Sequence, residues 1–384
     1  MTDRAQLRFS RLHVENWRNF ARIEVDLQQR VFLVGPNASG KSNLLDVFRF
    51  LRDLGAVGGS SQEAVESRGG LPRLRCLAAR NPSDVVVGVD LGDTDSAVSW
   101  SYQLSFGQDS RKHPIVKKEI IRKNGSEILS RPDDDDRRDP VRLTQTHLEQ
   151  VNVNQAFRDV ATFFASVRYL HIVPQLIRDP ERSAGRKNDP YGGDFLEQIA
   201  RTPEKTRKGR LTRIRRALRV AVPQLKQLEL ARDRVGTPHL RGKYEHWRPQ
   251  GAWQTEGQFS DGTLRLLGLL WAALDGSGPL LLEEPELSIH SEVVRFIPQM
   301  FARIQSDSGR QILTSTHSPE LLSDESIGLD EVLLLQPGTE GTTVRLAKDF
   351  LEVRELLGGG ANLAEAVIPR TRPAEAHQLT LFSR

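Results

Sequence analysis

The chain has 384 residues, 38% hydrophobic and 27% charged, which is typical of a folded globular protein and excludes a disordered one. Its 54 Lys and Arg against 50 Asp and Glu leave a net charge of only +4, so nucleic-acid binding must be argued from local clustering. One cysteine, Cys76, excludes an internal disulfide and a Cys-x-x-Cys zinc hook. Because no stretch has the length of a membrane span or an apolar signal core, we expect a cytoplasmic protein.

The first predicted elements form a strand, a glycine-containing loop and a helix. Ile23, Val25 and Leu27 alternate with polar residues, which predicts a half-exposed strand. The continuous apolar run 31–34 predicts a strand buried on both faces. It leads directly into Gly35, and residues 43–51 read as a helix. This order is the context that a phosphate-binding loop requires.

The loop itself matches G-x-x-x-x-G-K-[ST]. Its residues are Gly35, Pro36, Asn37, Ala38, Ser39, Gly40, Lys41 and Ser42, followed by Asn43. Glycines let successive backbone N–H groups point at phosphate oxygens, and the following helix adds the positive end of its dipole. Lys41 is expected to reach the β- and γ-phosphates and Ser42 to bind Mg²⁺. We therefore predict ATP binding by residues 35–43.

Residues 85–129 read as an antiparallel meander, best seen in the alternation over 98–106. We expect it to belong with the phosphate loop to a first lobe, residues 1–135. Residues 131–140 carry a proline at each end and dense charge, which predicts a solvated loop. Its four consecutive Asp residues do not predict a metal site, because consecutive side chains do not converge on one ion.

Residues 136–256 are predicted to be a helical insert. Leu211, Ile214 and Leu218 mark the buried face of one helix in it. The opposite face gathers the cations Arg207, Lys208, Arg210, Arg213, Arg215 and Arg216. Nucleic-acid phosphates are one partner for this face. A solvated surface and a contact with an acidic partner protein are the alternatives.

Residues 257–357 alternate helices and strands and contain three further motifs, and residues 358–384 read as a weakly ordered tail. Phe259–Thr263 precedes an apolar helix that Ser260 is placed to cap. The apolar strand 280–282 ends in Glu283, Glu284 and, after Pro285, Glu286, as a Walker B strand does. A later apolar strand ends in Thr316-His317, and a histidine there can donate a hydrogen bond to a phosphate.

The order of these motifs resembles the ABC-type ATPases of the SMC/RecF/OLD group. The resemblance implies that Ser260 and Gly262 form a signature segment that acts on ATP held by a second subunit, that His317 is the switch histidine, and that 287–290 is the D-loop. It also implies that Arg18, in an Asn-Phe-Arg-like segment, lies near the nucleotide. Glu283 stands where this family usually has Asp, and Gln145, Gln150 and Gln155 remain open as the Q-loop residue.

We therefore expect an α/β fold, a P-loop ABC-type ATPase head with an antiparallel β subdomain and a helical lobe, that uses ATP and Mg²⁺ and dimerises around them. Glu284 would be the general base, Lys41 and His317 would contact the γ-phosphate, and Ser42 and Glu283 would hold the metal. The resemblance implies a nucleic-acid-linked sensor or motor in prokaryotic anti-phage defence or DNA repair. A separately encoded nuclease or TOPRIM-like effector would act with it, since residues after His317 show no Asp-x-Asp cluster.

Two other functions stay open. The first is an ATP-dependent scaffold that controls a toxin or effector without contacting nucleic acid. The second is a transporter ATPase, which is less compatible with the altered signature segment and the long insert.

Overall fold

Two hydrophobic cores lie on opposite faces of a central, mostly parallel sheet. The computed structural model describes residues 7–79, 83–92, 98–181, 189–247 and 252–371. The central sheet has the order β15-β14-β3-β13-β12-β8, and only β15 runs antiparallel to its neighbour. Its strands are β3 (Arg30–Val34), β8 (Arg168–Leu170), β12 (Leu280–Glu283), β13 (Ile312–Thr316), β14 (Val332–Gly338) and β15 (Gly341–Leu346).

Strand β3 shows why this sheet is the middle layer. All five of its residues are buried. Val31 and Leu33 belong to one core, whereas Phe32 and Val34 belong to the other. Because successive side chains of a strand point to opposite faces, a continuous apolar run fills both cores at once. The predicted doubly buried strand is confirmed.

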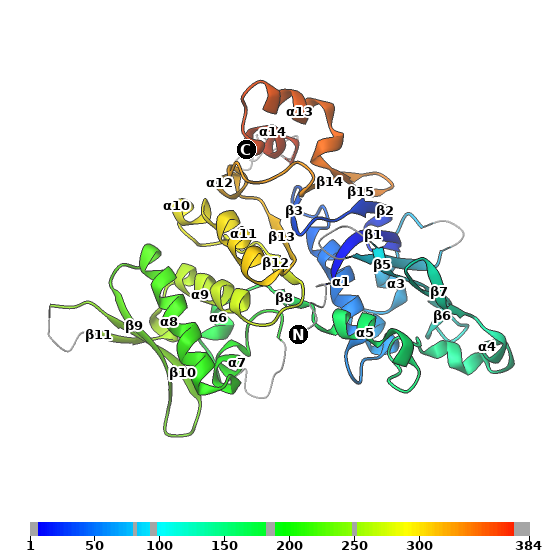
Figure 1. The fold of residues 1–384 in the computed structure, drawn as a ribbon, viewed down its shortest axis with the longest axis horizontal. Helices are drawn as coiled ribbons and strands as arrows, with labels where there is room; N and C mark the ends of the chain where they lie inside the picture. Colours follow the sequence, from blue (N-terminus) through cyan, green and yellow to red (C-terminus); the bar gives the residue numbers. More distant parts are fainter. Residues whose placement is uncertain (1–6, 80–82, 93–97, 182–188, 248–251, 372–384) are drawn as a thin grey trace, which may run out of the picture.

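The first core is closed by an antiparallel outer sheet of order β2-β1-β4-β5-β6-β7, on the right of Figure 1. Trp100, Tyr102, Leu104 and Phe106 alternate along β5 and are all buried, which confirms the predicted meander. The strands are β1 (Arg8–Trp17), β2 (Phe20–Asp26), β4 (Val85–Gly92), β5 (Val98–Gln108), β6 (Pro114–Lys123) and β7 (Ser126–Arg131). The helices of this part are α1 (Lys41–Gly55), α2 (Ser61–Glu66), α3 (Leu71–Leu74), α4 (Asp134–Arg138), η1 (Pro140–Thr144), η2 (Asn154–Phe157) and α5 (Arg158–Ala165).

The second core lies under the other face of the central sheet and extends into a lobe at the opposite end of the molecule (Figure 1). Its helices are α6 (Pro174–Ile177), α7 (Phe195–Arg201), α8 (Glu204–Ala221), η3 (Glu256–Gln258), α9 (Asp261–Leu274), α10 (Ser291–Val294), α11 (Ile297–Ser308) and α12 (Pro319–Leu322). A small antiparallel sheet of order β11-β10-β9 completes the lobe: β9 (Leu225–Arg232), β10 (Pro238–Tyr244) and β11 (Ala252–Thr255).

This small sheet corrects the expectation that residues 136–256 form a helical insert. Residues 225–255 supply β9–β11, and β8 from the same stretch belongs to the central sheet. Leu228 and Leu230 alternate with Gln227 and Glu229 at the strand period, and Gly236, at φ +93°, turns the chain between β9 and β10. Pairing between these segments therefore forms strands where the many charged residues make the alternation of apolar and polar residues hard to see in the sequence.

The predicted weakly ordered tail is also wrong as far as residue 371. Helices α13 (Leu351–Gly358) and α14 (Leu363–Val367) follow η4 (Ala347–Asp349) and precede η5 (Ile368–Thr371). Leu363, Ala366 and Val367 are buried in the second core, because apolar residues on one face of α14 can pack there. Residues 372–384 of the predicted tail lie outside the described residues. Within the described ranges, no helix combines the length and the apolar character needed to cross a membrane.

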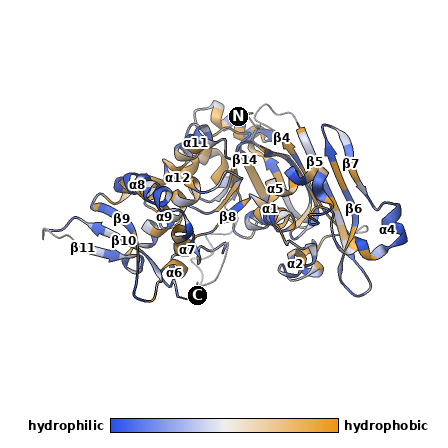
Figure 2. Cartoon of the chain, turned by 60° about the horizontal axis from the view of Figure 1, so that its bottom comes forward, coloured by the Kyte–Doolittle hydropathy of each residue, from blue (hydrophilic) through white to orange (hydrophobic). Residues whose placement is uncertain are grey.

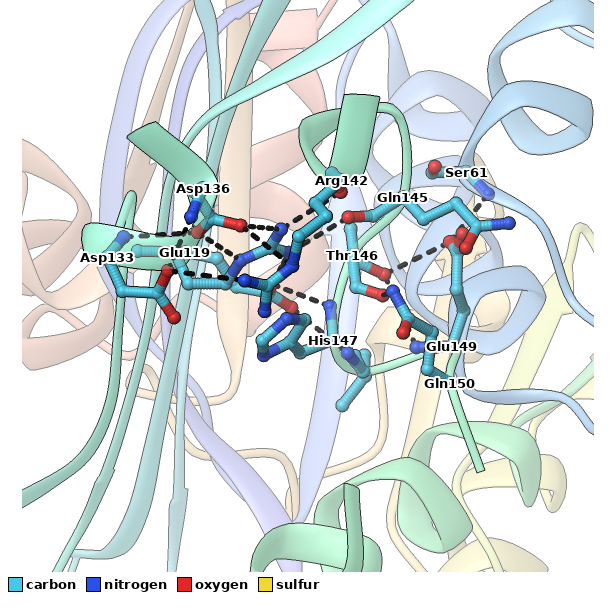
Figure 3. A network of polar contacts seen from close by, with 12 residues as sticks. Ser61, Glu119, Asp133, Asp136, Arg142, Gln145, Thr146, His147, Glu149 and Gln150 are labelled. Atoms are coloured by element: carbon cyan, nitrogen blue, oxygen red, sulfur yellow. Dashed lines mark hydrogen bonds and ion pairs between the residues drawn. The ribbon is translucent and has the colours of Figure 1, made fainter. Parts of the chain in front are cut away.

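A buried polar network stabilises the outer sheet and corrects part of the prediction of a solvated loop at 131–140 (Figure 3). The segment contains α4 and buries Arg131 and Asp136, whereas most of its other residues are exposed as predicted. Arg131 is 1% exposed and Asp136 is also 1% exposed. The Arg131 guanidinium donates to Asp136 at 2.8 and 2.9 Å, to Glu119 at 3.2 Å, and to the carbonyls of Arg142 and Gln145 at 2.9 Å. These five bonds use all five guanidinium donors, which is what permits burial of the charge.

The backbone of the same segment explains why it is ordered. Asp133 caps α4, accepting from the backbone N–H of Asp136, whose carboxylate accepts from the N–H of Asp133 in turn. This reciprocal pair is a capping box, and its three-residue spacing is present in the sequence. Hydrogen bonds from Arg131 lower the pKa of Asp136 from 3.8 to about 2. Burial raises the pKa of Glu119.

We expect Asp136→Ala to lower the free energy of unfolding by about 3–5 kcal/mol at neutral pH, because it leaves the buried Arg131 charge short of its main partner. Urea unfolding measures this cost. The Asp136 contribution is fully present above pH 3.8 and is lost as pH falls through about 2, so the difference from wild type should narrow in that window. Asp135→Ala, at a side chain that is 64% exposed, is the matched control and should change stability by less than about 0.5 kcal/mol. Equal effects of the two changes would contradict the burial argument.

Candidate active site

The parallel strands of the central sheet bring distant motifs to one edge. Val34 pairs with Thr316, and Glu283 pairs with Ser315. Leu170, the last residue of β8, pairs with Leu282. Because the carboxyl ends of parallel strands meet at the same edge, the loop after β3, the acidic turn Glu283–Glu286 and His317 converge there.

The phosphate loop, Gly35–Ser42, is held by Asn19. Asn19 Nδ2 donates to the Ser39 carbonyl at 2.9 Å, and Asn43 Nδ2 donates to Asn19 Oδ1 at 2.8 Å. Gly40 has φ +95°, and a Cβ there would lie 2.2 Å from Asn19 Nδ2. Only glycine fits both the left-handed backbone and this close approach. Helix α1 starts at Lys41 without a side-chain cap, so its first N–H groups have no side-chain acceptor.

Arg18, expected near the nucleotide, pairs with α1, the helix that follows the phosphate loop. Its guanidinium donates to Asp46 Oδ2 at 3.1 Å. The neighbouring Asn19 makes the contact with the phosphate loop instead. Arg18 and Asn16 both have positive φ, and this tight turn between β1 and β2 is what points Asn19 at the loop.

Lys41 lies against the loop that precedes it. Its Nζ donates to the carbonyls of Gly35 at 3.0 Å and Pro36 at 3.1 Å, and the side chain is buried. Burial lowers the pKa of Lys41, and three carboxylates of the acidic turn oppose this shift. A cation in this position is suited to a phosphate anion, which can replace the carbonyls as its partner.

Glu283, the last residue of β12, joins the phosphate loop to β8. Ser42 Oγ donates to one oxygen of its carboxylate, and the hydroxyl of Tyr169 donates to the other. Burial raises the pKa of the Tyr169 hydroxyl, which keeps it a neutral donor. A hydroxyl and a carboxylate in contact are hard oxygen ligands of the kind that Mg²⁺ binds together with substrate phosphates and water.

Glu284 and His317 form a pair at the ends of β12 and β13. His317 Nε2 lies 3.2 Å from Glu284 Oε1. The His317 ring beside it lowers the pKa of Glu284, which favours the ionised carboxylate. Glu284 has φ +43°, and its N–H donates to the Ser315 carbonyl at 3.1 Å. An ionised carboxylate beside a histidine can accept a proton from water.

Glu286 is a third acid that the sequence motifs did not assign a role. Thr316 Oγ1 donates to it at 2.5 Å, and the N–H of His317 donates at 3.2 Å. Burial raises the pKa of Glu286. Glu286 therefore fixes the start of the His317 segment relative to the acidic turn and acts as a positioning residue.

The three glutamines that stay open as the Q-loop residue lie before β8 in the chain. Strand β8 borders β12, and the His171 that follows it lowers the pKa of Glu284 electrostatically, after the larger effects of His317 and Lys41. Gln145 instead offers its carbonyl to Arg131, and the side chain of Gln150 donates to the Thr146 carbonyl. Gln155 lies in η2. The order of strands in the sheet, which the sequence does not state, is what brings the end of β8 beside Glu284.

The signature segment, Phe259–Thr263, sits at the start of α9. Ser260 Oγ accepts from the Thr263 N–H at 3.2 Å, which confirms the predicted cap. A Cβ on Gly262 would lie 2.3 Å from the Ser288 carbonyl, so α9 is packed directly on the D-loop position. Arg178 donates to Asp261 at 2.5 Å and to the Phe259 carbonyl at 2.7 Å. Among the described residues, no hydrogen bond joins Ser260 to the phosphate loop of its own chain.

The predicted basic face lies on α8, and most of its cations have local partners. Lys208 pairs with Glu204 at 2.6 Å and Arg210 with Asp275 at 2.7 Å. Arg207 and Arg215 donate to backbone carbonyls. Arg213 and Arg216 are exposed, and neither has a hydrogen bond or ion pair within the described part of the chain. The buried face of Leu211, Ile214 and Leu218 is confirmed.

Comparison with known proteins gives a family and a fold. The sequence matches the family described as "AAA domain, putative AbiEii toxin, Type IV TA system" over residues 30–323. No curated protein matches it. The structure is similar to the SMC head bound to the C-winged helix domain of ScpA, with 11% identity, a TM-score of 0.51, and coverage of 88% of this chain and 96% of that one.

Two further SMC heads are similar at lower TM-scores. One is the SMC head domain from Thermotoga maritima, with 12% identity, a TM-score of 0.43, and coverage of 88% of this chain and 98% of that one. The other is the SMC head domain with an extended coiled coil bound to the C-terminal domain of ScpA, derived from Pyrococcus furiosus. It has 11% identity, a TM-score of 0.49, and coverage of 92% of this chain and 100% of that one. At such identity the first match shows the fold alone, and it confirms the predicted α/β head.

The contact between α9 and Ser288 leads to a prediction that alanine changes the free energy of unfolding in opposite directions at two glycines, Gly262 in this contact and Gly209 outside it. We expect Gly262→Ala to lower the free energy of unfolding by about 1–3 kcal/mol, because the backbone of Ser288 must move. Gly209→Ala, in the exposed middle of α8 with open space around its Cβ, should raise it by about 0.5–1 kcal/mol. Urea denaturation of both variants tests the pair. A neutral Gly262→Ala would show that α9 is not packed on the D-loop position.

Proposed function

Because this chain belongs to the family of AAA domains described as putative AbiEii toxin of type IV toxin–antitoxin systems, and to the ABC-type ATPases of the SMC/RecF group, we propose that it binds and hydrolyses ATP with Mg²⁺. The observation that carries the proposal is the convergence of the phosphate loop, Glu283, Glu284 and His317 at one edge of the central sheet.

The residues at this edge fit a nucleotide triphosphate with its metal. The uncapped start of α1 offers backbone N–H groups to phosphate oxygens. Ser42 and Glu283 are in contact and would hold Mg²⁺. The metal would supply charge neutralisation on the phosphates. Within the described ranges, no group of three or more His, Cys, Asp or Glu side chains could hold a metal ion.

The chain's own residues would then perform the chemistry. Lys41 would exchange its two carbonyl partners for phosphate oxygens and stabilise charge on them. Glu284, kept ionised by His317, would orient the attacking water and accept its proton. Glu286 would hold the backbone of His317 in place.

The complete site would need two copies of the chain. Ser260 is exposed at the start of α9 and makes its hydrogen bonds within its own helix turn. We propose that Ser260 and Gly262 reach ATP on the phosphate loop of a second subunit, so that ATP-Mg²⁺ holds a homodimer together. Since Gly262 packs on Ser288, this contact would couple the signature segment to the acidic turn.

The basic helix α8 supports a nucleic-acid-linked role. Residues 201–247 hold 14 Lys and Arg against 4 Asp and Glu, a surplus of ten in a chain whose total surplus is four. Arg213 and Arg216 would contact phosphates directly. We propose a sensor or motor in prokaryotic anti-phage defence or DNA repair, working with a separately encoded effector such as a nuclease.

A second candidate function is an ATP-dependent scaffold that holds a toxin or effector protein. The family description names a toxin. An apolar groove of about 210 Å³ between α8, α9 and α11, lined by Ile214, Leu270, Met300 and Ile304 and bordered by Arg213, would suit a partner helix. ATP binding with turnover at background would favour this candidate over the first.

The dimer proposal gives one prediction. We expect Glu284→Gln to double its light-scattering mass when ATP and Mg²⁺ are added, because the variant keeps ATP bound but has lost the base. The double variant Glu284→Gln with Ser260→Arg should stay monomeric, since the arginine blocks the partner's nucleotide. A mass that does not respond to ATP would contradict an ATP-dependent dimer.

The nucleic-acid proposal gives another. Arg213→Glu with Arg216→Glu should weaken binding of duplex DNA by about tenfold or more at low salt, and should reduce the slope of log affinity against log salt by about two. Fluorescence anisotropy across a salt series measures both. Arg137→Glu with Arg138→Glu makes the same charge change on exposed α4, at the far end of the molecule (Figure 1), and should have little effect. Equal losses in both variants would indicate only a response to net charge.

A further inference from the structure

The small sheet β9–β11 presents two opposite faces. Leu240 and Gly242 of β10 are buried, and Leu240 packs in the same core as Leu211 and Leu218 of α8. The residues that alternate with them, Arg241 and Lys243, therefore point to the other face, away from α8. In Figure 2 this end of the molecule is largely hydrophilic in colour. We call this outward side the platform face.

Cations and an aromatic ring interleave on the platform face. Lys243 pairs with Trp253 of β11 across the strands. The guanidinium carbon of Arg241 lies 4.7 Å from the centre of the Trp253 ring, and Lys243 Nζ lies 6.0 Å from it. Trp253 is 36% exposed, and Trp247, between β10 and β11, is 81% exposed. Large aromatic side chains left exposed beside cations mark a binding surface.

The charge on the platform face fits a polyanion. Arg241 and Lys243 directly oppose Glu229 and Gln227 of β9, so cations exceed acids across the three strands. An open pocket of about 550 Å³ continues the platform face past Arg241, His239 and Thr255 to Arg178. Four acids also line this pocket, Asp179, Glu181, Asp233 and Glu256, so the excess of cations belongs to the strands and not to the pocket. Glu256 accepts from His239 and from the N–H of Leu240.

We propose that the platform face binds single-stranded nucleic acid, with a base stacked on Trp253 and the backbone phosphates on Arg241 and Lys243. Every base has a face that can stack on an aromatic ring, whereas a duplex hides those faces. The inference deepens the nucleic-acid part of the proposed function and rests on it, but it assigns the bases to a surface that α8 does not share.

The position of the pocket links this surface to the ATPase site. Arg178 lines the pocket and also holds Asp261 and the Phe259 carbonyl of the signature segment. A strand that runs from Trp253 along the pocket would end at a residue that fixes the start of α9. Nucleic acid on the platform face would in this way act on the part of the chain that meets the partner's ATP.

The test is anisotropy with fluorescein-labelled oligo(dT) and oligo(rU), which also separates DNA from RNA as the source of the strand. We expect Trp253→Ala to weaken binding of at least one of them about tenfold or more, and Trp253→Phe to bind within about threefold of wild type. Because stacking carries no counterion release, Trp253→Ala should leave the salt slope unchanged, unlike the α8 double variant. Val235→Ala, at an exposed residue of the β9–β10 turn, is the control, and thermal melting checks folding.

The outcomes separate this inference from the proposed function. If wild type binds an oligonucleotide, and Trp253→Ala binds it equally well, the platform face is not the stacking site and only this inference fails. If wild type binds neither oligonucleotide nor duplex, the nucleic-acid part of the proposed function fails with it. Loss of a co-purifying protein partner in Trp253→Ala, with oligonucleotide binding unchanged, would assign the face to a protein and overturn the inference.

Discussion

The parallel pairing of β3, β13 and β12 is the constraint on which the site depends. Its register is fixed because alternate residues of β3 fill two different cores, so a slip of one residue would exchange Val31 and Leu33 with Phe32 and Val34. The same register places Glu283 opposite Ser315 and Val34 opposite Thr316. Hydrophobic packing on both faces therefore positions polar groups at the edge of the sheet.

The protein partners its buried and half-buried charges in two ways. Arg131 uses every donor it has on fixed partners, which makes the outer sheet a rigid support. Lys41 instead donates to two backbone carbonyls, and Glu283 accepts from two hydroxyls, all of them neutral groups. Neutral partners can be exchanged for phosphate or metal at lower cost than ionic ones. Saturated networks thus hold the frame, and exchangeable ones form the site.

Much of this could be predicted from sequence because the key motifs are local. A strand, a glycine loop and a helix fall within 31–51, and the acidic turn is contiguous. The contacts that the sequence did not predict depend on the pairing of strands that are far apart in the chain. Tyr169 lies 114 residues from Glu283 in the chain but in contact with it, because β8 borders β12. The capping box in 133–136 can be recognised in the sequence, but the burial of Arg131 could not be predicted, because it depends on Glu119 from another strand. The cation–aromatic pairing on Trp253 needed the register of β10 with β11.

The positive φ of Glu284 affects which substitutions the acidic turn can accept in evolution. At φ +43° the residue occupies a region that favours glycine and costs other residues roughly 1–2 kcal/mol. Replacing it with glycine would relieve that strain, while most replacements that keep a side chain, asparagine and aspartate excepted, would retain it. Selection for stability alone therefore pulls this position toward glycine, and only selection for the carboxylate holds it. A lineage that no longer needed this carboxylate would gain stability by losing it.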